Sequence, residues 1–224
     1  MRTPRSASFL VLSPVLGFAA CGVPAPPDFA TFTDFAAMGK VDEVRAGLAA
    51  HPEWAKAQLP GSGRTALHSA ALLGRVEVAQ VLCEAGADVA AVTSDENATP
   101  LHTAAERGQD DFVAFLLTRK PPLEAKDRFG RTPLAAACWG AGPYQHLVRI
   151  LLEAGAQVEA TDATGFTPLM LAAVHGNPDV LGVLLQRGAK VDVVAEDGRT
   201  ALSVARDGGH AEAVTLLEQA GARK

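Results

Sequence analysis

The stretch GRTALHSAALLGRVEVAQVLCEAGADV, from Gly63 to Val89, reads as two short apolar helices, the second of which is closed by a glycine. Nearly the same phrase returns four more times before the chain ends. When the copies are aligned on their threonines, the successive steps are 34, 33, 35 and 33 residues. Those threonines are Thr65, Thr99, Thr132, Thr167 and Thr200. A period in this range is typical of a solenoid, in which each unit is one supersecondary element stacked on the next.

Each copy carries signals for two helices. The threonine suits a helix N-cap, because its side-chain oxygen can accept a hydrogen bond from a backbone N–H that lacks a partner within the helix. Proline follows at Pro100, Pro133 and Pro168, at the first helical position, where a missing N–H costs least. A glycine then breaks the first helix, and the second helix carries a pair of apolar residues such as Leu151 and Leu152. Glycines after four of the second helices suit left-handed helix ends.

The phrases T-P-L-H-x-A-A and L-L-x-x-G-A resemble the ankyrin repeat, over roughly Gly63 to Ala222. The resemblance, taken as one to the bacterial type, implies an all-α repeat solenoid, an ankyrin-type stack of helix-turn-helix units joined by β-hairpin-like loops. The predicted units are a degenerate N-terminal capping repeat at 29–60, repeats at 61–93, 94–126, 127–161 and 162–194, and a C-terminal capping repeat at 195–224.

Two copies depart from the common pattern. In the second, Lys120 and two prolines replace the glycine at the helix end, so we expect a stiffer exit from that helix. In the third, two additional residues stand between the helices, and we expect this insertion to lift Tyr144 out at the turn. Both a binding device and tolerated loop variation are compatible with these departures.

The N-terminal segment MRTPRSASFLVLSPVLGFAACGVPAPPD lies outside the repeats. Two arginines precede a short apolar run that ends in small residues, an order that fits a secretory signal peptide. The ending before Cys21 also resembles the bacterial lipoprotein signal, in which the cysteine is lipidated, although Phe18 stands where that signal usually has leucine. We therefore expect a signal peptide at 1–21, membrane attachment through Cys21, a Pro-rich tether at 22–28, and export to the cell envelope. Ordinary cleavage after export and a cytoplasmic leader remain alternatives.

Charge and chemistry exclude several classes of function. The formal net charge of -5, with no run of Lys or Arg, argues against a nucleic-acid surface. His68 and His102 occupy equivalent positions, but adjacent helices pack about 8–10 Å apart, too far for both to ligate one zinc ion. The family resemblance instead implies that each imidazole bridges the backbone turns beside its threonine. No serine or cysteine lies beside a plausible base, so we predict no catalytic residue, cofactor, metal or small-molecule substrate.

Recognition of a protein partner is the function that remains. In stacks of the ankyrin type, the loop tips and the exposed side of the first helix form a concave face. Carried onto this chain, the resemblance implies a partner-binding set of Leu72, Leu73, Asp95, Glu96, Glu106, Arg107, Arg128, Phe129, Arg131, Trp139, Tyr144, Phe166, Val174 and His175.

Trp139 is the most informative member of this set, because tryptophan and arginine dominate binding hot spots near interface centres. It lies in the third of five repeats, and its neighbours in the set make the predicted centre aromatic and basic, suited to an acidic or amphipathic partner segment. The alternative is that Trp139 packs locally into the turn from Gly140 to Tyr144. Trp54 is expected to pack the N-terminal cap onto the first full repeat, and the polar last repeat to be a solvated end cap.

The sequence thus predicts a monomeric, non-catalytic module that binds a partner protein. Two alternatives remain within this prediction: an inhibitor or accessory subunit of an enzyme, and a protein that protects the cell envelope under stress. An intrinsic enzyme is disfavoured, because it would need a pocket with convergent titratable groups.

Overall fold

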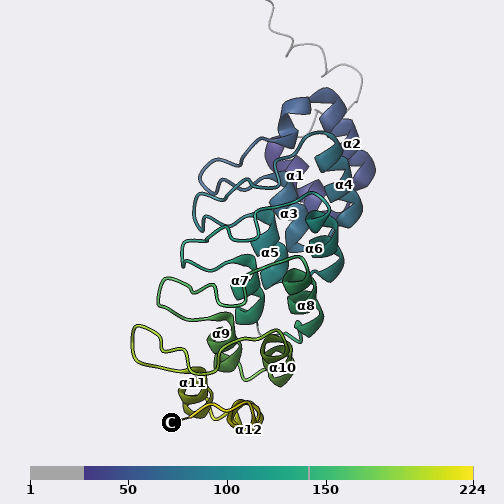
Figure 1. Cartoon of the computed structure of the whole chain (residues 1–224). Coiled ribbons are helices and arrows are strands. Elements are labelled where there is room, and N and C mark those ends of the chain that lie inside the picture. The colour runs from purple at the N-terminus through teal and green to yellow at the C-terminus, as the bar shows by residue number, and fades with distance from the viewer. Residues whose placement is uncertain (1–27, 141, 224) are drawn as a thin grey trace, which may run out of the picture.

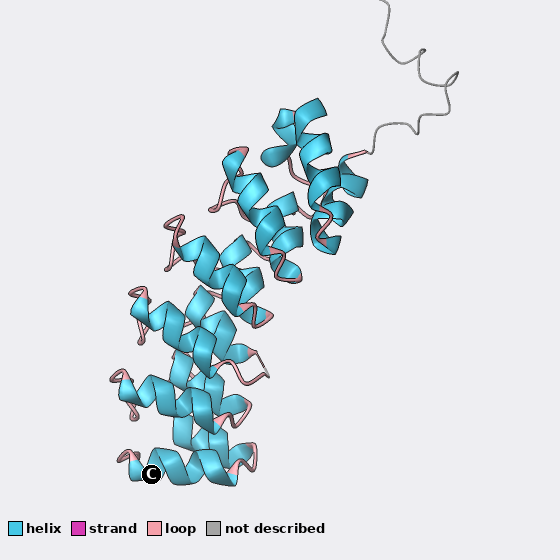
Figure 2. Cartoon of the chain, turned by 90° about the vertical axis from the view of Figure 1, so that its right-hand side faces the viewer, coloured by secondary structure: helices cyan, strands magenta, loops and turns pink. Residues whose placement is uncertain are grey.

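A computed structural model describes residues 28–140 and 142–223 of the 224-residue chain. Within these residues the chain forms twelve α-helices and one short 3₁₀ helix, with no strand (Figure 2). The helices are stacked as successive pairs, which confirms the predicted all-α solenoid of helix-turn-helix units (Figure 1). The predicted signal peptide, Cys21 and residues 22–27 of the predicted tether lie outside the described residues.

The pairs form two parallel rows (Figure 1). The first helices of the pairs are α1 (Phe29–Met38), α3 (Ala66–Leu72), α5 (Pro100–Glu106), α7 (Pro133–Trp139), α9 (Pro168–Val174) and α11 (Ala201–Asp207). The second helices are α2 (Val41–Ala50), α4 (Val76–Glu84), α6 (Asp110–Leu117), α8 (Gln145–Glu153), α10 (Pro178–Gln186) and α12 (Ala211–Gln219). The 3₁₀ helix η2 (Pro52–Ala55) follows α2.

The five threonines begin the first helices of the full repeats, as predicted. In each case the side-chain oxygen accepts a hydrogen bond from the backbone N–H three residues later, at 3.2 to 3.4 Å. The three predicted prolines occupy the start of α5, α7 and α9. Asn97, which replaces the usual glycine before the threonine, adopts the left-handed φ of +51° that this turn requires. These local signals fix where each repeat begins.

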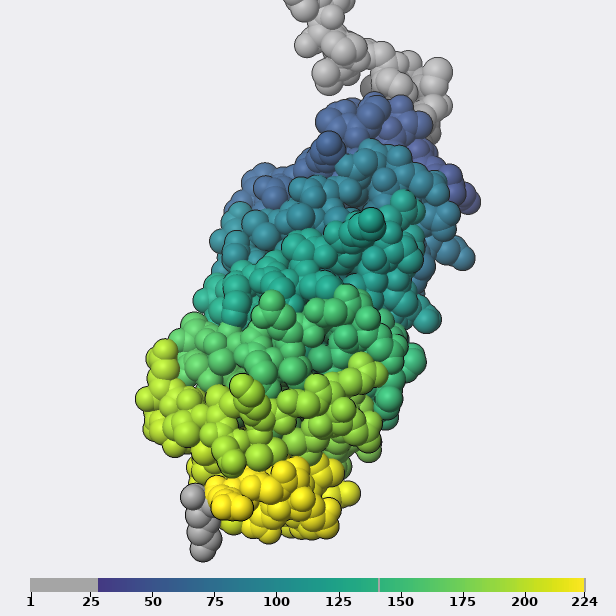
Figure 3. Space-filling view, in the orientation of Figure 1, coloured from purple at the N-terminus to yellow at the C-terminus, as the bar shows by residue number. Residues whose placement is uncertain are grey.

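The core runs continuously between the repeats. Alanines make the first helices thin, and Ala70 and Ala104 are fully buried where neighbouring helices of this row pack together. Leucines of the second helices, among them Leu82, Leu116 and Leu151, are also fully buried. Each fully buried leucine side chain contributes about 1.5–3 kcal/mol relative to an exposed one. The colour bands of the space-filling view show the same arrangement, because each layer adjoins the layers next to it in sequence (Figure 3).

The loops between repeats are hairpin-like and are bonded to one another. Asp127 N–H donates to Arg131 O at 3.0 Å across one loop, and Asp162 N–H donates to Phe166 O at 2.9 Å across the next. Backbone bonds also join each loop to the one before it, with donor and acceptor pairs Ser94 and Ser62, Arg128 and Glu96, Ala163 and Phe129, and Glu196 and Thr164. The loops project from the side of the first helices (Figure 1). They therefore form one hydrogen-bonded row.

The N-terminal cap is held by aromatic side chains. The Trp54 ring lies 5.0 Å from the Phe32 ring and 6.0 Å from the Phe29 ring, measured between centroids, and it stacks on His51 at 4.2 Å. Helix α1 packs on α3 of the first full repeat. The aromatic contacts of Trp54 lie within the cap, and the cap packs onto the first full repeat through α1 on α3, α2 on α4, and η2, which carries Trp54, on α3.

The structure corrects one expectation about the departures from the repeat. Tyr144 is not lifted out: its side chain is half-buried and packs across Gly108 of the preceding repeat. A methyl group added at Gly108 would lie 2.2 Å from Tyr144 Cε1. At the other departure, Lys120 adopts a φ of +54°, so this lysine makes the same left-handed helix exit that glycine makes at Gly86 and Gly155.

Candidate functional site

A groove follows the stack between the loop tips and the ends of the first helices. It consists of three hollows, of about 50, 260 and 490 Å³, which follow one another from the first full repeat to the last. The second hollow lies between Phe129 and Trp139, and the third lies between Trp139 and Phe166. Trp139, Asp162 and Leu171 line both of these hollows. Trp139 therefore lies at the centre of the larger part of the groove.

The walls of the central hollow are aromatic. Phe129 on its loop tip is 45% exposed, and Trp139 at the end of α7 is 39% exposed. The Trp139 ring meets the ring of His175, in the next repeat, edge to face at 5.0 Å and 74°. Tyr144 packs against Gly140 and Gly142 in the turn after α7, and the aromatic contact of Trp139 is with the next repeat. The contact with His175 supports the Trp139 ring on one side, and part of the side chain is accessible to solvent.

Arginines lie over the ring of Phe129 and pair with carboxylates. The guanidinium carbon of Arg131 is 4.7 Å from the ring centroid, and its Nη2 is 2.8 Å from Asp127 Oδ2. Arg128 lies 4.5 Å from the same centroid and 3.8 Å from Glu96 Oε1. The buried Asp127 also accepts the N–H groups of Phe129 and Arg131 at 2.8 Å each, so it fixes both the loop and the guanidinium.

The same arrangement occurs at the last loop. Arg199 lies 4.8 Å from the centroid of Phe166, and its Nε is 2.6 Å from Asp197 Oδ2. Phe166 is only 5% exposed. Its ring therefore presents little surface to the groove and supports Arg199 from beneath.

The structure also corrects the predicted basic centre of the face. Arg128, Arg131 and Arg199 each pair with a carboxylate of the loops. Three further carboxylates, those of Glu106, Asp162 and Glu196, line the two larger hollows and have no ion-pair partner in the described part of the chain. The two hollows that adjoin Trp139 are therefore acidic and aromatic, whereas Arg107, which lines only the smallest hollow, has no ion-pair partner among the described residues.

Comparison with protein families agrees with this geometry. A sequence model of the ankyrin repeat matches residues 62–94, and a model of three ankyrin repeats matches residues 90–162, 119–195 and 142–224. Together these matches cover well over half of the chain. The chain belongs to the ankyrin repeat family. Ankyrin repeats are protein-interaction modules, and the family is generally non-catalytic.

Several characterised ankyrin proteins are similar to this chain. Ankyrin repeat and SOCS box protein 16 of Homo sapiens is 36% identical over 124 residues, covering 53% of this chain and 27% of that protein. Inversin of Mus musculus is 34% identical over 117 residues, which cover 52% of this chain and 11% of inversin. Neurogenic locus notch homolog protein 1 of Xenopus tropicalis is 37% identical over 127 residues, which cover 56% of this chain and 5% of the notch protein. The matched part is at most about a quarter of each relative, and these eukaryotic relatives do not support the expected bacterial type.

The structure places most of the predicted partner-binding residues of this ankyrin stack along the groove. Those that line its hollows are Leu72, Asp95, Glu96, Glu106, Arg107, Arg128, Phe129, Arg131, Trp139, Phe166 and Val174. Leu73 is exposed just beyond the end of α3, and His175 supports the Trp139 ring. Tyr144 lines none of the three hollows, because it packs across Gly108.

Sequence reasoning omitted two residues that line both larger hollows, Asp162 and Leu171. Leu171 is an ordinary apolar residue of α9, and no sequence signal distinguishes it from the core. Asp162 does carry a signal, since it stands five residues before its threonine, as Asp127 does. In both loops this aspartate accepts backbone N–H groups two and four residues later. An aspartate five residues before the threonine therefore marks the carboxylate that accepts the backbone N–H groups of the hairpin-like loop.

The two equivalent histidines bridge ankyrin repeats, as the resemblance implied. His68 Nδ1 lies 3.2 Å from Thr65 N, and its Nε2 lies 2.9 Å from the carbonyl oxygen of Ala98 in the next loop. His102 makes the equivalent contacts with Thr99 and with the carbonyl of Arg131. Burial lowers the pKa of His68 to about 4 and lowers the pKa of His102 as well. Both side chains are therefore neutral structural bridges.

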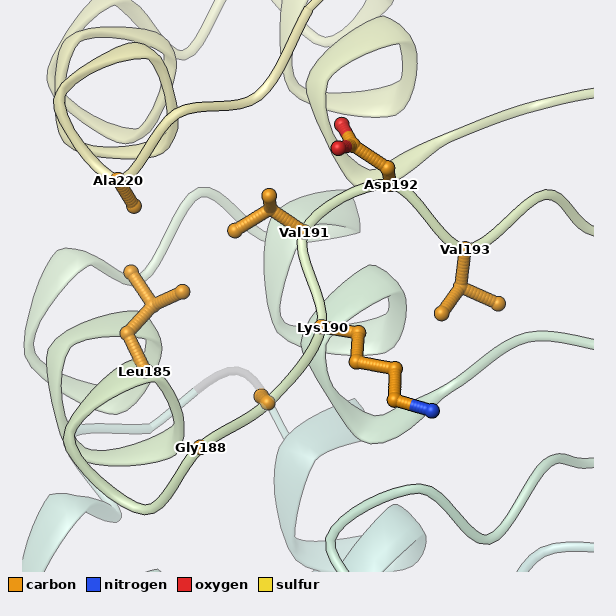
Figure 4. A pocket seen from close by; sticks show the side chains of 8 residues that line it. Leu185, Gly188, Lys190, Val191, Asp192, Val193 and Ala220 are labelled. Atoms are coloured by element: carbon orange, nitrogen blue, oxygen red, sulfur yellow. The ribbon is translucent and has the colours of Figure 1, made fainter.

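A further hollow, of about 590 Å³, lies away from the groove (Figure 4). Leu185, Val191 and Ala220 face one another there, between the end of α10 and the end of α12. Among residues 28–140 and 142–223, no group of three His, Cys, Asp or Glu side chains is close enough to hold a metal ion. No helix in that part of the chain has the length and apolarity needed to cross a bilayer.

Proposed function

We propose that this ankyrin chain is a non-catalytic module that binds a partner protein in the groove centred on Trp139. The observation that carries the proposal is the pair of exposed aromatic rings, Phe129 and Trp139, which face one hollow in the middle of the stack. Tryptophan is enriched among residues that dominate binding energy, and such residues gather near the centre of an interface.

The rigidity of the groove supports this proposal. Backbone hydrogen bonds join each loop tip to its neighbour, and the buried carboxylate of Asp127 fixes the tip that carries Phe129. A surface that is ordered before binding loses less conformational entropy when the partner arrives. The groove is thus suited to hold a partner segment without reorganisation.

The proposed binding function includes two possible effects on the partner protein. The partner is either held as in a scaffold, or it is an enzyme that the stack inhibits or assists by covering its active site. Adding the purified chain to the assay of an identified partner enzyme separates these outcomes. We propose a monomer, which light scattering during size-exclusion chromatography tests directly.

The proposed cellular location rests on the leader sequence alone. Its two arginines, its apolar run and Cys21 support export and lipidation, and an envelope protein would then be the partner, or the chain would protect the envelope under stress. Mass spectrometry of the chain purified from the source cells tests this. A lipid-modified Cys21 at the mature N-terminus supports export as a lipoprotein, whereas an intact leader contradicts it.

The binding function is tested by quantitative capture from a total lysate of the source cells, envelope included. Wild-type chain is compared with Trp139→Ala and with Val194→Ala, a control that shortens an exposed apolar side chain outside the three groove hollows. We expect a partner that Val194→Ala retains and Trp139→Ala loses, with unchanged circular dichroism for both variants. Equal capture by all three proteins would contradict the groove as the binding surface.

A further inference from the structure

We infer that the hollow beside Trp139 receives an arginine side chain of the partner, carried on a segment that combines basic and apolar residues. This arginine site presupposes the proposed binding function and narrows it to one chemical class of partner segment. It is indicated by a combination of aromatic ring, guanidinium and carboxylate that occurs at two of the loop tips and that lacks its guanidinium at Trp139.

The complete arrangement joins an aromatic ring, a guanidinium and a carboxylate. Arg131 lies over Phe129 and is bonded to Asp127, and Arg199 lies over Phe166 and is bonded to Asp197. Arginine suits such a place because its planar group can stack on a ring while its N–H groups donate to a carboxylate. Lysine has a compact ammonium group and cannot do both with the same geometry.

At Trp139 the ring and the carboxylates are present, but the cation is not. Glu106 and Asp162 line the same 260 Å³ hollow as the indole. In the described ranges, no lysine or arginine lies over the Trp139 ring, and neither of these carboxylates has an ion-pair partner. The missing component is therefore a cation, which the partner can supply.

The two arginines that line this hollow, Arg128 and Arg131, are already engaged. Arg131, which lies over the Phe129 ring, donates from both Nε and Nη2 to Asp127, at 2.8 Å each. Arg128 lies over the same ring and pairs with Glu96. Asp162 is held in place because its Oδ1 accepts two backbone N–H groups and the hydroxyl of Thr164. Its carboxylate is thus fixed toward the loop through one oxygen, and its other oxygen has no hydrogen bond within the described residues.

The neighbouring hollow indicates what surrounds the arginine in the partner. It adds the carboxylate of Glu196, which has no ion-pair partner among the described residues, together with the apolar side chains of Leu171 and Val174. A segment that crosses from Glu106 to Glu196 would meet negative charge near both ends and apolar surface between them. The complementary segment has basic residues that flank an apolar one, whereas the sequence predicted an acidic or amphipathic segment.

The test uses three short synthetic peptides with one apolar frame and a fluorescent label. Two flanking positions hold arginine, citrulline, which is uncharged and nearly isosteric, or glutamate. Their dissociation constants for the full chain are measured by fluorescence anisotropy at low salt and at about 0.3 M salt. We expect the arginine peptide to bind about tenfold more tightly than the citrulline peptide at low salt, and less so at high salt, because exposed ion pairs are screened.

The charge is then removed from the site without removing its hydrogen-bond acceptors. The groove variant is Glu106→Gln with Asp162→Asn, which keeps an oxygen for the loop N–H groups, and the matched control is Glu84→Gln with Asp111→Asn on the second helices. We expect the arginine advantage to fall to about twofold or less in the groove variant and to persist in the control. Three results would overturn the inference. The glutamate peptide could bind more tightly than the arginine peptide, the citrulline peptide could bind as tightly as the arginine peptide, or the groove variant could still prefer arginine over citrulline as wild type does.

Failure of the arginine peptide to bind at all would also overturn it. The proposed function is judged separately, by Trp139→Ala in the capture experiment. A partner that Trp139→Ala loses and the groove variant keeps would leave the binding function standing and remove the arginine site. A partner that both Trp139→Ala and the groove variant keep would remove the binding function as well.

Discussion

The buried imidazole of His68 predicts that the chain loses stability in mild acid. Its side chain is fully buried, and Nε2 faces the carbonyl oxygen of Ala98, which can only accept a hydrogen bond. Nε2 must therefore carry the proton, and Nδ1 accepts the N–H of Thr65. A second proton on Nδ1 would face that donor and would place a positive charge in the core. Burial accordingly lowers the pKa of His68 to about 4.

The size and sign of the effect follow from this pKa. An unfolded histidine has a pKa of about 6.5, so between about pH 6.5 and pH 4 the unfolded chain binds one more proton than the folded chain. The contribution of His68 to the free energy of unfolding is complete above about pH 6.5. It falls by about 1.4 kcal/mol for each pH unit as the pH is lowered from about 6.5 to about 4. Lowering the pH from about 7 to 5 should cost about 2 kcal/mol from His68 alone. The lowered pKa of His102 acts in the same direction.

Urea unfolding of wild type and of His68→Gln at these pH values tests the reasoning. Glutamine does not titrate, so the variant should be less stable at neutral pH but should lose about 2 kcal/mol less than wild type on acidification. His146→Gln, which removes an exposed histidine of α8, is the control and should lose as much as wild type. If wild type and His68→Gln lose the same free energy, with unchanged dependence on urea, the assignment of His68 as a neutral buried bridge is wrong.

Three stability predictions concern the backbone and can be checked by the same unfolding assay. Lys120→Gly should stabilise the chain by about 1 kcal/mol, because this lysine occupies a left-handed conformation that glycine adopts without strain; an unchanged midpoint would contradict this. Thr132→Ala should cost about 1 kcal/mol through loss of the N-cap bond to Ala135, whereas Thr132→Ser should cost much less. Gly108→Ala should cost more than Gly155→Ala, by about 1–3 kcal/mol, because both have positive φ but only Gly108 lies against the Tyr144 ring; equal losses would show that Tyr144 yields easily.

The stack could be predicted from sequence because its decisive interactions are local or between neighbours. Thr132 caps a helix whose first residue is Pro133, and this signal needs no knowledge of the rest of the fold. The recurring leucines of the second helices are buried by the repeats next to them, so a periodic pattern is sufficient to identify them. The same regularity placed Trp139 on the groove, because the last residue of each first helix occupies an equivalent position.

The charge of the groove could not be predicted in this way. Arg131 and Arg199 are basic in the sequence, but whether they are available depends on carboxylates that each loop turns toward them. Phe166 stands at a loop position that is exposed in a general ankyrin pattern, yet here its ring is buried beneath an arginine. Tyr144 follows an insertion, and only the packing against Gly108 decides that its ring turns inward. These outcomes depend on side-chain pairing in three dimensions, which repeat spacing does not encode.

The hydrogen-bonded row of loops has a consequence for how binding can be detected. Each loop is joined to the one before it, as Arg128 is to Glu96 and Ala163 is to Phe129, so the stack behaves as a linear series of units coupled only to adjacent units. A ligand that spans the central loops would stabilise those units directly and would slow their local opening, while the two ends would continue to fray. Amide hydrogen exchange should therefore map the length of the bound segment, repeat by repeat, before its sequence is known.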